Sequence, residues 1–312
     1  MFDVLQNRCS KTHGYIATDI VGYGYNPRVA RLKDSSQSLD IYKPFFTAKA
    51  ATRIASSYYT TNSRKKMIFT GHSMGYLPSL LAAIDSCSEE AINSNIVLVL
   101  SAPALLVGNI DNFSHQVDTK EILRTYKEEI NKSPGRRYVG KSNFVTRKLK
   151  FLLSLVANLA TLPLRILLKR ILRTTSVWSS ALSSAWGSDK NHLDAATIAQ
   201  YKLPAICSNF LLDFYNWLVA QSERNSFRPK DSTETMSYVS CLIALLNLGA
   251  KVVIVHGTED KIIPIENSYR LVKFLNSRLS AVAGKLEFHA LPGIGHVPHE
   301  ECPELFVEKM LN

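Results

Sequence analysis

A five-residue segment of this sequence, Gly71-His72-Ser73-Met74-Gly75, places a serine between two glycines. It directly follows the apolar run KMIFT and precedes a stretch with helical periodicity. A tight turn between a strand and a helix needs small residues at both glycines. Such a turn presents its central serine at the top of the sheet, with the helix N-terminus behind it. The segment therefore predicts a nucleophilic serine, and the alternative is a glycine-rich turn with an incidental serine.

A serine hydroxyl is a weak nucleophile, so this chemistry also needs a general base and a carboxylate that orients the base. Asp260 lies in the loop after the apolar run KVVIVH, and His296 lies in the loop after the run KLEFHAL. Both loops are expected at the carboxyl ends of parallel strands, where the sites of open α/β sheets assemble. His299 is the competing base and Glu259 the competing acid, although the glycines before His296 leave its loop freer to present a side chain.

The elements that must position these side chains follow from the hydrophobic pattern. Short apolar runs bounded by turn residues predict strands, and stretches with helical periodicity predict helices. Strands are expected at residues 15–19, 66–70, 95–101, 251–256 and 285–291, and helices at residues 48–61, 74–87, 267–279 and 303–311. Because strands and helices alternate, the fold class is α/β with a mostly parallel sheet.

No strand is expected between residues 104 and 249, which predicts a long helical cap inserted into an α/β core of residues 1–103 and 250–312. The chain's net charge of +11 is concentrated in this insertion, because residues 130–188 contain eleven Lys and Arg but no Asp or Glu. A nucleic-acid partner is not expected, since such proteins more often spread their cations over a folded face with aromatic residues between them.

The charged part of the insertion, residues 141–175, contains a predicted basic amphipathic helix. Its apolar stripe consists of Leu164, Leu167, Leu168 and Ile171. Its opposite face carries Arg165, Lys169 and Arg173. Pro163 should kink or divide this helix from the apolar residues before it. One interpretation places the segment in an anionic membrane interface that delivers a lipidic substrate. The other packs it over the active site as a cap helix with solvated cations.

The segments ATDIVGYGYNPR, MIFTGHSMG, VVIVHGTEDKIIP and LPGIGHVPHEECPE together resemble the α/β-hydrolase fold-1 family of esterases, lipases and C–C bond hydrolases, and they occur in the family's order. The resemblance implies that Ser73 is the nucleophile, Asp260 the acid and His296 the base. It also implies that the backbone N–H of Met74 is one donor of the oxyanion hole.

The family's sheet normally begins with further strands and an HG loop that gives a second oxyanion donor, whereas here 14 residues precede the segment YIATD. The resemblance therefore implies a fold shortened at its N-terminus. His13-Gly14 is not a substitute for the HG loop, because it runs straight into the predicted strand. Losing one oxyanion donor typically costs about 100- to 1,000-fold in turnover.

The expected function is hydrolysis of a carboxylic ester or related acyl compound, with a small-molecule acyl substrate, water as second substrate and neither a metal ion nor a cofactor. The five cysteines form no CxxC pair, which disfavours a zinc site. C–C bond hydrolysis and a non-catalytic, membrane-associated relative are the alternatives. Without a secretory signal or a spanning segment, the protein is expected inside the cell, in the cytoplasm or peripherally on a membrane.

Overall fold

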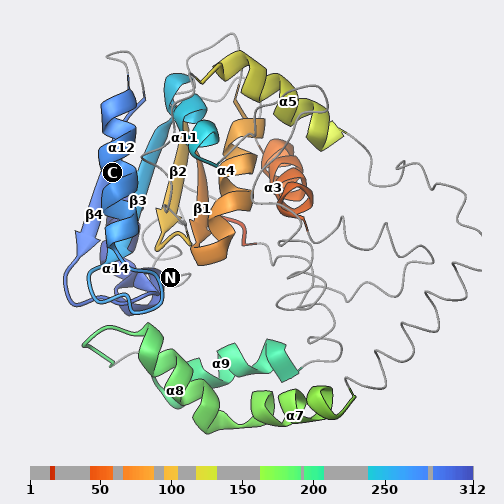
Figure 1. The fold of residues 1–312 in the computed structure, drawn as a ribbon, viewed down its shortest axis with the longest axis vertical. Helices are drawn as coiled ribbons and strands as arrows, with labels where there is room; N and C mark the ends of the chain where they lie inside the picture. The colour runs from red at the N-terminus through yellow and green to blue at the C-terminus, as the bar shows by residue number, and fades with distance from the viewer. Residues whose placement is uncertain are drawn as a thin grey trace, which may run out of the picture.

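The structure is a computed structural model that describes residues 15–17, 43–58, 66–87, 95–104, 117–131, 162–190, 193–206, 238–279 and 284–311. Its strands are β1 (Met67–His72), β2 (Ile96–Ser101), β3 (Lys251–Gly257) and β4 (Leu286–Leu291). They form one sheet in the order β1-β2-β3-β4, and each neighbouring pair is parallel (Figure 1). The predicted α/β fold class and these four predicted strands are confirmed.

The strand predicted at residues 15–19 is wrong for residues 15–17, the part of it that the structure describes. Residues 15–17 have no regular secondary structure, and Tyr15 and Ile16 are exposed. Residues 18–42, which include most of the segment ATDIVGYGYNPR, lie outside the described part of the chain, as does His13-Gly14. Among the described strands, β1 therefore stands at the edge of the sheet.

Both faces of the sheet are covered, which explains why β2 and β3 are almost continuously apolar. Alternate residues of these strands belong to different core clusters: Leu98 and Ile254 pack on one face, and Val99 and Val253 pack on the other. The helices on the first face are α3 (Pro44–Tyr58), α4 (Tyr76–Asp85), α5 (Thr119–Asn131), α11 (Tyr238–Asn247) and α12 (Glu266–Arg278). The opposite face is covered by α14 (Pro303–Leu311).

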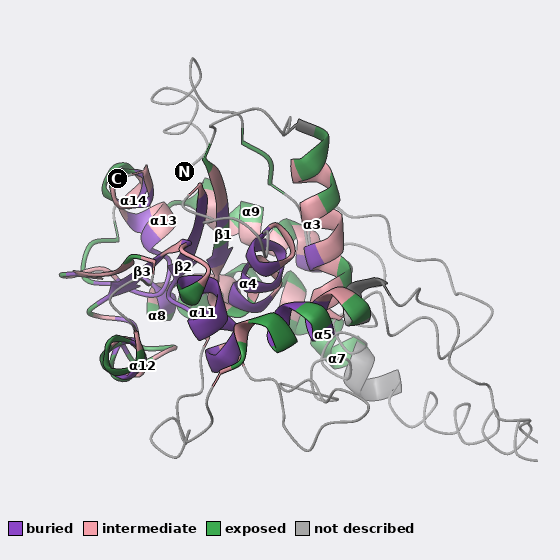
Figure 2. Cartoon of the chain, turned by 90° about the horizontal axis from the view of Figure 1, so that it is seen from above, coloured by how far each residue is buried: buried purple, intermediate pink, exposed green. Residues whose placement is uncertain are grey.

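The described helices between residues 104 and 249 fall into two groups. α5 and α11 pack with α4 in the main core, and Figure 2 shows α4 and α11 largely buried. By contrast, α7 (Leu162–Arg173), α8 (Thr175–Ala185) and α9 (Ala195–Ile206) form a separate layer beyond the carboxyl ends of the strands (Figure 1). The term cap layer is used below for these three helices. The domain division itself stays a prediction.

The predicted basic helix is α7, and Pro163 lies in its first turn. Proline is tolerated there because the first N–H groups of a helix have no acceptor within the helix. The apolar residues 151–161 before it lie outside the described part of the chain. Among the described helices, none combines the length and apolar character that crossing a bilayer requires.

Candidate active site

Ser73 lies at the sharp junction where β1 ends and the 3-10 turn η1 (Ser73–Gly75) leads into α4. Its φ of 50° is in the left-handed region that side chains rarely adopt, which marks a strained turn. A Cβ atom at Gly71 would come within 3.0 Å of Gly75 O and Ser79 Oγ, so a glycine is required there. The expectation that Gly75 also has no room for a side chain is wrong, because a Cβ there would meet no described atom within 4 Å.

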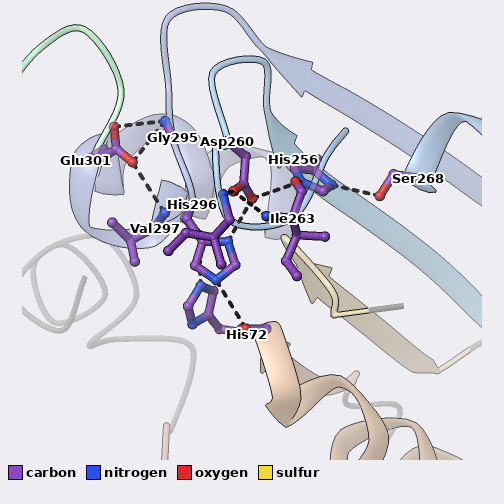
Figure 3. Close-up of polar contacts among 11 residues, drawn as sticks. His72, His256, Asp260, Ile263, Ser268, Gly295, His296, Val297 and Glu301 are labelled. Carbon is purple, nitrogen blue, oxygen red and sulfur yellow. Dashed lines mark hydrogen bonds and ion pairs between the residues drawn. The ribbon is translucent and has the colours of Figure 1, made fainter. Parts of the chain in front are cut away.

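Three predicted residues from distant parts of the sequence meet at this turn. The Ser73 hydroxyl donates a hydrogen bond to His296 Nε2 at 3.1 Å. His296 Nδ1 in turn donates to Asp260 Oδ2 at 2.7 Å (Figure 3). His296 and Asp260 are both buried, so their interaction is shielded from solvent. This arrangement holds an imidazole in the tautomer that accepts the serine proton.

The carboxylate of Asp260 is held on both of its oxygens. Oδ1 accepts the backbone N–H groups of Ile262 and Ile263, each at 2.8 Å, and Oδ2 accepts from His296 and from His256. Burial by itself would raise the pKa of Asp260, but the hydrogen bonds from His256, His296 and Ile263 outweigh it and hold that pKa well below its usual range. Asp260 is therefore an anion throughout the neutral range.

The two competing residues have other partners. His299 packs against His72 in a tilted arrangement with ring centroids 4.6 Å apart, and its Nε2 lies 3.8 Å from a carboxylate oxygen of Glu300. Glu259 accepts the hydroxyl hydrogen bond of Ser188 at 2.6 Å. The geometry therefore favours His296 over His299 as the base, and Asp260 over Glu259 as the acid.

His72, the residue before Ser73 in this turn, supports His296 through a hydrogen bond to the backbone of His296. Its Nε2 donates to the carbonyl oxygen of His296 at 2.8 Å, and the two rings lie with centroids 4.9 Å apart. Burial lowers the pKa of His72 to about 4, so its imidazole is neutral at physiological pH. An uncharged His72 would not repel a protonated His296.

The N–H of Met74 is the expected oxyanion donor. It belongs to the first turn after Ser73, where N–H groups have no acceptor within the helix and point toward an incoming anion. The Met74 side chain is exposed, so it does not bury this part of the turn. His13-Gly14, which was not expected to supply a second oxyanion donor, lies outside the described residues.

A contact that the sequence did not reveal joins the cap layer to the loop that carries His296. Residues 185–188, called the strap here, run beside residues 293–296. The N–H of His296 donates to Ala185 O at 2.6 Å, and the N–H of Ser188 donates to Gly293 O at 3.1 Å. A Cβ at Gly187 or at Gly295 would come within 3.0 Å of the opposing backbone, so only glycine allows this approach.

Glu301 fastens the strap to the same loop. Its buried carboxylate accepts the N–H group of Gly187 at 2.8 Å. It also accepts the N–H groups of Gly295 at 3.0 Å and Val297 at 3.3 Å (Figure 3). Gly295 and Val297 flank His296, so this one side chain fixes the backbone on both sides of the base. Glu301 was not predicted, because a glutamate in a polar run such as HEEC carries no signal that distinguishes it from a solvated one.

No group of three or more His, Cys, Asp and Glu residues in the described part of the chain is arranged to hold a metal ion.

Comparisons with known proteins identify the fold. No protein-family model matches the sequence, and no curated protein is significantly similar to it. The structure resembles an esterase from Exiguobacterium antarcticum, with 12% identity, a TM-score of 0.52, and coverage of 99% of this chain and 85% of the esterase. It also resembles MGS-M2, an α/β-hydrolase enzyme from a Medee basin deep-sea metagenome library, with 13% identity, a TM-score of 0.52, and coverage of 99% of this chain and 82% of that enzyme. The chain has the α/β-hydrolase fold.

Proposed function

We propose that this chain, built on the α/β-hydrolase fold, hydrolyses a carboxylic ester or related acyl compound through an acyl-serine intermediate. The observation that carries the proposal is the continuous hydrogen-bond chain from Ser73 Oγ through His296 to Asp260, at 3.1 Å and 2.7 Å. Two solved structures with the same fold, an esterase and an α/β-hydrolase enzyme, are consistent with it.

In the proposed mechanism, Ser73 Oγ attacks the acyl carbonyl carbon while His296 Nε2 takes the hydroxyl proton. The N–H of Met74 donates to the oxygen that becomes negatively charged. His296 then gives its proton to the leaving oxygen as the C–O bond breaks. Water, activated by the same nitrogen, attacks the acyl carbon and releases the acid. Asp260 stabilises the imidazolium in both halves of the reaction.

Labelling with a fluorophosphonate probe tests this proposal, because such a probe reacts covalently only with an activated serine. We expect the purified chain to be labelled at Ser73 and the Ser73→Ala variant to show no labelling. The matched control is Ser57→Ala, which removes an exposed hydroxyl on α3 and should be labelled like the unmodified chain. A cooperatively folded chain that resists the probe would instead support the non-catalytic alternative.

Labelling of an active serine would not distinguish ester hydrolysis from C–C bond hydrolysis, since both reactions use a serine triad. Ester hydrolysis predicts turnover of p-nitrophenyl acyl esters, with a burst of nitrophenol equal to the number of labelled serines when deacylation is slow. Turnover of a β-diketone without turnover of any ester in the series would favour the C–C bond alternative.

We further propose that the substrate is lipidic and that the cap layer meets it at an anionic membrane surface. Seven large apolar side chains of this layer are exposed, namely Ile166, Leu167, Leu168, Ile171, Val177, Leu203 and Ile206. Exposed cations lie among them on α7, namely Lys169, Arg170 and Arg173. An exposed apolar surface edged by cations fits the interface of a bilayer with anionic headgroups. Arg165 belongs to the same helix by position.

Reversing two of these charges, Lys169→Glu with Arg173→Glu, is expected to lower binding to phosphatidylserine-containing vesicles by at least about tenfold, since each cation near such a surface contributes about 1 kcal/mol. Co-sedimentation at low ionic strength measures this change. The matched control is Lys120→Glu with Arg124→Glu, a pair of exposed cations with the same spacing on α5. Equal effects of the two pairs, or unchanged binding in both, would contradict a role for the cap layer.

A further inference from the structure

A second histidine is buried on the far side of the catalytic carboxylate. His256, in β3, has no exposed surface, and both of its ring nitrogens are engaged. Nε2 lies 3.0 Å from Asp260 Oδ2 and 3.0 Å from the carbonyl oxygen of Ile263. Nδ1 lies 2.8 Å from the hydroxyl oxygen of Ser268 on α12. Figure 3 shows Asp260 between the rings of His256 and His296.

The partners determine where the proton of this imidazole sits. The carboxylate and the Ile263 carbonyl are acceptors only, so Nε2 must carry a hydrogen and donate it. Ser268 has a hydroxyl that can donate, so Nδ1 is the acceptor of the neutral ring. Ser268 therefore fixes His256 in the Nε2–H tautomer, with its hydrogen directed at Asp260.

This bond completes the set of donors around Asp260. Two backbone N–H groups hold Oδ1, while Oδ2 is shared between the two imidazoles on opposite sides. Without His256, His296 would be the only described residue that holds Oδ2, and it is the group whose orientation Oδ2 has to determine. A rigid anchor on the other side therefore sets the position that His296 Nδ1 must meet.

The same bond also limits how strongly Asp260 attracts a proton on His296. A hydrogen bond to a carboxylate disperses part of its negative charge, and the share taken by His256 is not available to the imidazolium. Loss of the His256 donor would favour the protonated form of His296. As the pH falls, the base form of His296 would then be lost at a higher pH than in the unmodified chain.

The other titratable groups near His296 do not supply a competing charge. His72 contacts its ring, and His299 packs against His72, but burial lowers the pKa of His72 to about 4 and that of His299 to about 3. Glu301 binds backbone N–H groups beside the base and not its ring. Among the described residues, Asp260 is the charged group that contacts the imidazole.

We infer that His256 is a positioning residue that orients Asp260 and moderates its charge through the Nε2–H bond, an inference that rests on the proposed hydrolase function. This role requires a hydrogen-bond donor at the position that Nε2 of His256 occupies. A glutamine at 256 can bring its amide nitrogen near that place, whereas the shorter asparagine reaches only the place of Nδ1. The two variants share an amide and differ in reach.

The test compares His256→Gln with His256→Asn by the pH dependence of fluorophosphonate labelling. We expect His256→Gln to label within about threefold of the unmodified chain and His256→Asn to label roughly 10- to 100-fold more slowly, the cost of a small misplacement of a catalytic group. In His256→Asn the pH at which labelling reaches half of its maximal rate should also rise by roughly half a pH unit or more, as the loss of a charge-assisted hydrogen bond predicts. A merely structural role would lower the rate without moving this midpoint. Equal rates and equal midpoints in the two variants would overturn the inference.

A measurement without turnover separates this inference from the hydrolase proposal. Nitrogen-15 NMR of the histidine rings in the Ser73→Ala chain reports which nitrogen of His256 carries the proton. We expect the Nε2–H tautomer, and a proton on Nδ1 or on both nitrogens would overturn the inference even if labelling succeeds.

If the unmodified chain is never labelled, the hydrolase proposal fails, while the tautomer of His256 and the low-field Nδ1–H signal of His296 still test whether His256 anchors Asp260. That signal should persist in His256→Gln and weaken in His256→Asn, and its persistence in both would also overturn the inference.

Discussion

Asp260→Asn is expected to lower the rate of ester hydrolysis by about 10,000-fold while the chain stays folded. The physical reason lies in the four donors around this side chain. Two backbone N–H groups face Oδ1 and two imidazoles face Oδ2, so all four sites demand an acceptor. An asparagine has one acceptor oxygen and one NH₂ group, and the NH₂ must therefore replace one of the two oxygens.

The backbone donors cannot reverse their polarity, so the new NH₂ group is forced to the side of the imidazoles. His296 then has to accept at Nδ1 and carry its hydrogen on Nε2, which faces Ser73 Oγ at 3.1 Å. A nitrogen that already holds a hydrogen cannot take the serine proton. The loss of activity therefore arises from the wrong tautomer and needs no change in the positions of the atoms.

Initial rates of p-nitrophenyl ester hydrolysis, measured beside thermal unfolding, test this prediction. The matched control is Glu259→Gln, the same chemical change one residue earlier. Glu259 accepts a hydrogen bond from Ser188 and not from the base, so its variant should stay within about tenfold of the unmodified chain. A larger loss in Glu259→Gln than in Asp260→Asn would identify Glu259 as the catalytic acid and contradict the assignment.

The four strands and the meeting of Ser73, Asp260 and His296 could be predicted because their signals are local. β2 and β3 are short runs of apolar residues, as expected for strands covered on both faces. Ser73 follows β1 in a turn with glycines, and Asp260 and His296 follow β3 and β4. Because parallel strands end at the same edge of a sheet, residues in three separate loops could be brought together without knowledge of the loops' conformations.

The contacts that support Asp260 and His296 could not be predicted, because they depend on approach between distant segments. Glu301 binds Gly187 across 114 positions of the sequence, and its polar neighbours give no indication of burial. The expectations for Gly75 and Gly295 also differ from the structure. Gly75 was expected to leave no room for a Cβ but has space around it, whereas Gly295 was expected to leave its loop freer but is tightly enclosed by backbone. Hydrophobic periodicity also does not reveal which surface an apolar helix such as α11 will cover.

Gly295→Ala is expected to lower the rate of probe labelling by about 100-fold or more, although Gly295 has no side chain that takes part in the chemistry. Its Cβ would come within 3.0 Å of Ala185 O, Gly187 N and Trp186 C, all of them backbone atoms. Backbone on this side cannot yield as a flexible side chain does, so the strap and the loop of the base have to separate.

Separation of the strap removes the contacts that hold His296 in place. The bond from the His296 N–H to Ala185 O, at 2.6 Å, is lost directly, and Glu301 can no longer bind both Gly187 and Gly295. A displacement of His296 Nε2 by about 1 Å from Ser73 Oγ is enough to cost on the order of 100-fold in rate.

Gly75→Ala is the matched control, since it adds the same methyl group to a glycine of the turn that carries Ser73. A Cβ at Gly75 meets no described atom within 4 Å, and its φ of −68° suits alanine, so labelling should stay within a few-fold of the unmodified chain. Labelling rates are compared after thermal unfolding has shown that both variants fold. Normal labelling of Gly295→Ala would mean that the base needs no support from the strap. A greater loss in Gly75→Ala would mean that the motif glycine, and not the strap, limits the geometry of the site.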